Sequence, residues 1–83
     1  MHYKPDNLPE LNVLMLFDPS SGQEGIKIHK SAAPNTITAA NRLFEMGFIT
    51  QIDGGYLTNR GREAAEHTQA LCMMLNAHRE KVT

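Results

Sequence analysis

The stretch Ile37–Glu66, ITAANRLFEMGFITQIDGGYLTNRGREAAE, decides the fold because it contains a helix, a hairpin and the start of a second helix. The first element is predicted as a helix over residues 31–46, capped by Ser31 or Asn35. Its apolar spacing assigns the core-facing side to Ile37, Ala40, Leu43 and Phe44. Gly47 is suited to end this helix, since glycine readily adopts the left-handed conformation found just after helices.

A tight β-hairpin is expected next. Two short β-prone runs, residues 48–52 and 56–58, flank the sequence Asp53-Gly54-Gly55, which favours a type I′ turn. Thr58 is a natural N-cap for the last helix, predicted over residues 59–80. A helix of that length spans roughly 33 Å at 1.5 Å per residue, which is long for so small a protein.

The segments on the N-terminal side complete the element order. Residues 1–7 are polar and are expected to be disordered, and a helix follows over residues 8–17, with Asp6 or Asn7 as its cap. Residues 25–29 alternate between apolar and polar side chains, which indicates a short strand with Ile26 and Ile28 turned inward. The sequence therefore predicts one α+β domain over residues 1–83, in the order helix, strand, helix, strand, strand, helix.

Composition and charge bound the function. The chain has 83 residues, one cysteine and a net charge of −1, which excludes a disulfide framework and argues against a general polyanion binder. No apolar run reaches the ~18 residues of a membrane span, so a cytoplasmic location without membrane contact is expected. Residues 26–62 nevertheless carry a net charge of +3, and such a charge asymmetry can mark a nucleic-acid surface.

The last helix suggests a homodimer. The run from Leu71 to Leu75 is apolar on every side of the helix, and one small domain cannot bury all of it. A second copy of the chain is the simplest cover, packed against the last helix and the end of the first. The interface residues expected on this basis are Leu14, Phe17, Leu71, Cys72, Met74 and Leu75.

Nothing in the sequence indicates an enzyme. No nucleophile is spaced with a base, the histidines have no metal-ligand spacing, and no cofactor-binding motif is present. Cys72 lies on an apolar stripe and is interpreted as a small buried hydrophobe. Glu63 and His67 are four residues apart, which is typical of a helix-surface pair. We therefore expect neither a metal nor a cofactor.

Two family resemblances are carried by short motifs. Residues 42–49, RLFEMGFI, followed by Tyr56-Leu57-Thr58 and Gly61, resemble the winged-helix regulators of the multiple-antibiotic-resistance type, although Phe48 stands where leucine is usual. The chain also looks like a small family of uncharacterised bacterial proteins, through GIKIH at 25–29 and DGGYLT at 53–58. The first resemblance implies a winged-helix-like fold with a recognition helix, a short wing and a dimerisation helix.

The winged-helix resemblance implies a DNA-associated regulatory module. Asn35, Thr38 and Arg42 would read bases, because they form a polar stripe along one helix. With the cations expected to hold phosphates, the candidate DNA-binding residues are Lys27, Lys30, Asn35, Thr38, Arg42, Arg60 and Arg62.

Two departures from the winged-helix pattern favour an alternative. Residues 30–34 leave room for only one helical turn where winged helices have a full helix, and Asp53 places a carboxylate at the wing tip. The alternative is a homodimeric protein-interaction or adaptor domain that keeps the winged-helix scaffold without DNA binding. It fits these features about as well as a DNA-binding module does.

Overall fold

The predicted α+β fold class and element order are confirmed by a computed structural model that describes residues 1–21 and 24–82. The elements are α1 (Asn7–Leu14), β1 (Ile26–Lys27), α2 (Pro34–Glu45), β2 (Ile49–Gln51), β3 (Gly54–Leu57) and α3 (Asn59–Val82). The strands form one antiparallel sheet in the order β1-β3-β2, with Ile26 opposite Gly55 and Ile49 opposite Leu57. The sheet therefore joins the hairpin to the short strand that precedes α2.

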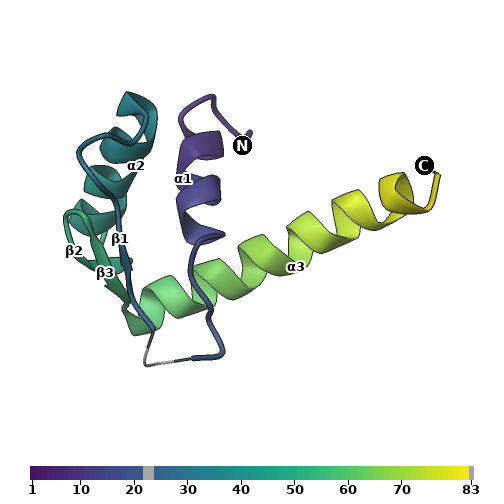
Figure 1. Cartoon of the computed structure of the whole chain (residues 1–83). Coiled ribbons are helices and arrows are strands. Elements are labelled where there is room, and N and C mark those ends of the chain that lie inside the picture. Colours follow the sequence, from purple (N-terminus) through teal and green to yellow (C-terminus); the bar gives the residue numbers. More distant parts are fainter. Residues whose placement is uncertain (22–23, 83) are drawn as a thin grey trace.

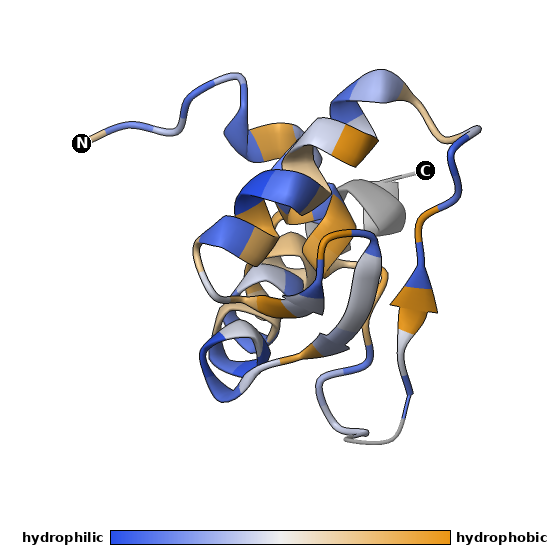
Figure 2. Ribbon diagram, turned by 90° about the vertical axis from the view of Figure 1, so that its left-hand side faces the viewer, coloured by the Kyte–Doolittle hydropathy of each residue, from blue (hydrophilic) through white to orange (hydrophobic). Residues whose placement is uncertain are grey.

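The helices pack on one another around a small core. Figure 1 shows α1 beside α2, with α3 passing under α1 and continuing beyond the body of the protein. Hydrophobic residues gather where the helices face one another, and hydrophilic residues occupy the outer turns (Figure 2). The buried core consists of Val13, Leu14, Phe17, Ala39, Ala40, Leu43, Ile49 and Ala65. Ile26 and Ile28 pack against it partly buried, as the alternation of strand residues predicted.

The end of α2 has the geometry expected of Gly47. Gly47 has a φ of +82°, its N–H donates to the carbonyl of Phe44 over 3.0 Å, and the N–H of Phe48 donates to the carbonyl of Leu43 over 2.9 Å. These two bonds form a Schellman motif, which satisfies carbonyls that the helix itself leaves free. The motif turns the chain sharply from α2 into β2.

The start of α3 is locked to the same corner. The hydroxyl of Thr58 accepts a hydrogen bond from the N–H of Gly61 over 3.0 Å, as predicted for the N-cap, and donates to the carbonyl of Gly47 over 2.6 Å. Gly61 packs directly on the backbone of Phe48, and a Cβ at this position would overlap with the Phe48 carbonyl oxygen. The spacing from Thr58 to Gly61 thus has a structural reason: a cap followed by a close backbone contact.

Several local predictions were wrong. Phe44, predicted on the core face of α2, is 41% exposed, whereas Ala39, which was assigned to neither side, is fully buried. The helix α1 ends at Leu14 rather than residue 17, and a tightened turn with i to i−3 hydrogen bonds carries the chain on to Phe17. Asp6 is the N-cap of α1, as one of the two predicted alternatives, but its side chain forms no capping hydrogen bond. The N-cap of α2 is Ala33, where Ser31 or Asn35 was predicted. Pro34, at the first position of α2, has no N–H to satisfy.

The hairpin and the turn before α2 also differ from expectation. The hairpin turn consists of Ile52 and Asp53, neither with positive φ, so it is not type I′. The positive φ values belong to Gly54 and Gly55, which lie in β3 where the register against β2 shifts. Residues 30–33 form a turn without helix, in which the N–H of Ala32 donates to the carbonyl of His29.

Candidate binding surfaces

Arg42 connects two helices instead of facing outward. Its Nε donates to Oε2 of Glu10 over 2.7 Å, and its Nη2 donates to the carbonyl of Asp6 over 3.3 Å. The amide of Asn7 donates to the other oxygen of Glu10, whose side chain is only 14% exposed. Although burial alone raises the pKa of Glu10, hydrogen bonds from Arg42 and Asn7 and the charge of Arg42 hold this pKa below its usual value. Arg42 would have to break its contacts with Glu10 and Asp6 before its side chain could bind a base.

The two arginines at the start of α3 also have partners within the chain. The guanidinium carbon of Arg60 lies 4.9 Å from the ring centre of Phe48, a cation–π distance. Arg62 donates through Nη1 to the carbonyl of Pro19 over 3.3 Å. Both side chains support the corner between α3 and the preceding loops, on a different element from Arg42.

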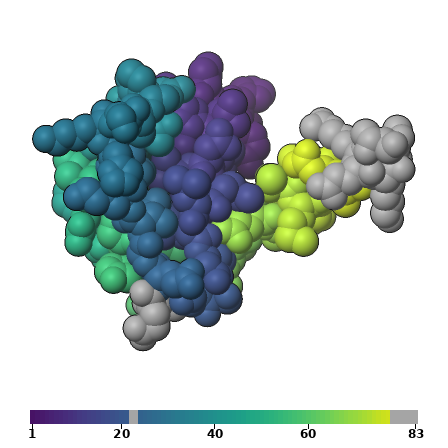
Figure 3. Space-filling model, in the orientation of Figure 1, coloured from purple at the N-terminus to yellow at the C-terminus, as the bar shows by residue number. Residues whose placement is uncertain are grey.

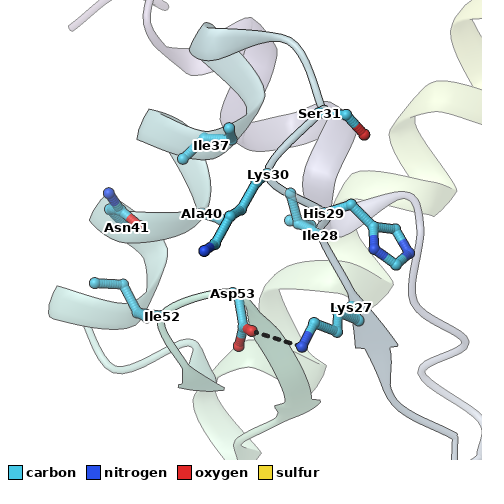
Figure 4. Close-up of a pocket in the computed structure, with 10 residues that line it drawn as sticks. All are labelled: Lys27, Ile28, His29, Lys30, Ser31, Ile37, Ala40, Asn41, Ile52 and Asp53. Carbon is cyan, nitrogen blue, oxygen red and sulfur yellow. Dashed lines mark ion pairs between the residues drawn. The ribbon is translucent and has the colours of Figure 1, made fainter.

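The two lysines border an open hollow of about 760 Å³. Figure 4 shows it between the turn before α2, the side of α2 that carries Ile37 and Asn41, and the tip of the hairpin. Lys27 lies on its rim, 3.7 Å from Asp53 in an exposed ion pair of little energetic weight. Lys30 extends over the hollow and forms no ion pair or hydrogen bond with any residue that the structure describes.

The seven candidate DNA-binding residues are therefore not brought together on one face. Asn35 and Thr38 are exposed on α2, outside the hollow, and the hydroxyl of Thr38 donates to the carbonyl of Pro34 over 2.9 Å. Lys27 and Lys30 lie at the hollow, whereas Arg42 is turned toward α1. At about 100° per residue, Asn35, Thr38 and Arg42 lie within roughly 60° of one another around α2, but Arg42 is held by Glu10 of α1 while the other two are exposed.

The expected dimer residues fall into two groups. Leu14 and Phe17 are 5% and 4% exposed, so they belong to the core of the chain and have almost no surface to offer a partner. Leu71, Cys72 and Leu75 line a hollow of about 280 Å³ between α1 and α3. Met74 is 74% exposed on α3 and is not among the residues that line this hollow.

Sequence reasoning missed the α1 side of this second hollow. Leu8, Leu11 and Met15 line it from α1, and Leu8 is 62% exposed. Their spacing of three and four residues was available in the sequence, but the same helix presents apolar residues almost all round. Only the packing shows that Val13 and Leu14 face inward. Two residues of the first hollow were also missed. Ile52 was predicted as the end of a hairpin strand and Asn41 as a polar residue on the surface of a helix, so neither was assigned to a site.

In residues 1–21 and 24–82, no three His, Cys, Asp or Glu side chains are grouped as they would be to hold a metal ion. Glu63 and His67 form an exposed pair 3.9 Å apart, and Cys72 is half-buried. No helix in the described part of the chain is long and apolar enough to cross a membrane.

Comparison with known proteins gives a match at the level of the family. No curated protein and no solved structure matches the chain. A family model described as a family of unknown function, DUF5669, matches residues 1–76, which include every element except the end of α3. This agrees with the expectation of an uncharacterised family, and the chain belongs to the DUF5669 family of unknown function.

Proposed function

We propose that the chain is a non-enzymatic, homodimeric protein-interaction module with a winged-helix-like frame, acting in the bacterial cytoplasm. One observation carries this proposal: three large apolar side chains in the second half of α3, Leu71, Met74 and Leu75, stay exposed on one side of the helix. A contiguous exposed apolar surface of this kind marks an interaction site, and a second copy of the chain can cover it.

The exposed surface is apolar where α3 leaves the body. Residues 70–77, ALCMMLNA, carry no charge, and Figure 3 shows this part of α3 projecting from the rest of the molecule. Leu71, Met74 and Leu75 are 38%, 74% and 59% exposed and form one strip along the helix. Leu71 and Leu75 of this strip also line the hollow between α1 and α3, so the strip and hollow of one copy can pack against those of a second copy about a twofold axis.

We expect the wild-type chain to sediment with twice the mass of 9.3 kDa at micromolar concentration. Leu75→Glu should weaken the dimer about 100-fold, because both copies would place a carboxylate in an apolar contact. The exposure of Leu75 in the single chain allows the variant to fold. Analytical ultracentrifugation over a concentration series measures the dissociation constant, and circular dichroism verifies the fold.

Met73→Glu is the matched control. Met73 is 71% exposed on the same helix but lies about 200° around it from Leu71, outside the strip. This variant should dimerise like the wild type. A wild-type chain that stays monomeric, or equal weakening by both variants, would overturn the proposed interface.

DNA contact is a second candidate function. Its support is the free ammonium of Lys30 beside Lys27, with Asn35 and Thr38 exposed on the neighbouring helix. If it holds, fluorescence anisotropy should show mixed-sequence duplex DNA binding at low salt and weakening steeply at physiological salt. Lys27→Ala with Lys30→Ala should reduce the salt slope by about two per chain, whereas Lys4→Ala should leave it unchanged. Absence of binding at low salt would eliminate this candidate.

A further inference from the structure

The hollow beside α2 combines an apolar floor with an unpaired positive charge. Ile28, Ile37 and Ile52 reach it from three separate segments, and Ile52 is 54% exposed at the hairpin tip. The ammonium of Lys30 projects over this floor toward Asn41 on the opposite wall (Figure 4). In this position, Lys30 can offer an ion pair and a hydrogen bond to a ligand. The apolar surface next to it is exposed to solvent in the single chain and can be covered by the same ligand.

We propose that this hollow is the docking site for an acidic, apolar peptide segment of a partner protein. The segment would place a carboxylate on Lys30 and its apolar side chains on the three isoleucines. Charge complementarity assigns the sign: of the two lysines that line the hollow, Lys27 is already opposed by Asp53, whereas Lys30 has no anion among the described residues. The inference rests on the proposed protein-interaction function and names the partner surface, which is separate from the dimer strip on α3.

The shape of the hollow favours a peptide over a small molecule or DNA. Small-molecule sites bury roughly 70–90% of their ligand, whereas this hollow is an open trough that leaves its occupant exposed on one side. A phosphate backbone bound in the hollow would contact three isoleucines and the carboxylate of Asp53, and it would find only Lys30 as an unpaired lysine there. This environment is unfavourable for a polyanion. A peptide brings apolar side chains for the floor and needs only one carboxylate for Lys30.

The isoleucines provide the measurement. The chain has five isoleucines, and three of them line the hollow. Of the other two, Ile49 is 2% exposed in the core and Ile26 packs against the core partly buried. Methyl-labelled isoleucine NMR of the full chain should therefore report binding directly. The probe is a short acetylated peptide amide that alternates leucine and aspartate, titrated to millimolar concentration. We expect the signals of Ile28, Ile37 and Ile52 to shift, and those of Ile26 and Ile49 to stay in place.

Charge reversal tests the role of Lys30. Lys30→Glu should weaken binding of this peptide about tenfold, whereas a leucine–lysine peptide should then bind better than it does to the wild type. Lys4→Glu, at an exposed lysine far along the chain, should change neither affinity. The matching leucine–asparagine peptide should bind more weakly than the aspartate peptide.

Three results would overturn the inference: no shift of the three methyl signals, equal binding of the aspartate and asparagine peptides, or displacement of the peptide by duplex DNA at physiological salt. The last result would assign the hollow to DNA. None of them bears on the dimer, because sedimentation measures that interface independently. A monomeric chain that still binds the acidic peptide would reject the dimer and retain the docking site.

Discussion

Gly61→Ala is expected to destabilise the fold by about 3 kcal/mol, because there is no space for a methyl group where α3 meets the backbone of Phe48. The obstacle is a carbonyl group inside the corner that joins α2, β2 and α3, so a side-chain rotation cannot relieve it. A chain of 83 residues has a total stability of only about 4–12 kcal/mol. The variant should therefore be partly unfolded at moderate temperature, with a much lower midpoint in urea.

Gly47→Ala provides the comparison for this effect. Gly47 has a positive φ, but nothing lies within 4 Å of the position of an added Cβ. Its cost should be only the roughly 1–2 kcal/mol of a left-handed backbone with a side chain. Urea unfolding of both variants at one protein concentration measures the two effects, since the proposed dimerisation would make stability depend on concentration. If Gly47→Ala proves the more damaging change, the close contact at Gly61 does not exist in solution.

Leu43→Ala should cost about 2–5 kcal/mol, whereas Phe44→Ala, at the next position, should cost about 1 kcal/mol. Leu43 is 2% exposed at the centre of the core, and its removal leaves a cavity that the surrounding helices cannot fill. Phe44 has the larger side chain but is 41% exposed, so its truncation removes less buried surface.

Chemical unfolding of this pair separates the two orientations of α2. The sequence pattern placed both residues on the core face, and the structure retains only Leu43. Equal losses of stability, or a larger loss for Phe44→Ala, would mean that α2 is rotated toward the predicted face. Circular dichroism of each variant before unfolding verifies that α2 itself remains helical.

The sequence alone predicted the features that depend on near neighbours in the chain. The element order, the helix end at Gly47, the cap at Thr58 and the inward side of residues 26–28 all follow from local chemistry. Each depends on a backbone conformation or a hydrogen bond that a few consecutive residues can form by themselves. The excess of apolar residues on α3, which supports the proposed dimer, was also readable as composition.

Only the tertiary structure decided which side chains are available at the surface. Arg42 looked like a reader until α1 placed Glu10 beside it, and Leu14 and Phe17 looked like interface residues until the core enclosed them. The hollow beside α2 joins residues from β1, the turn before α2, α2 itself and the hairpin tip, which are up to 26 positions apart in the sequence. Periodicity shows that a helix has an apolar side, but the partner packed against that side determines the residues it covers.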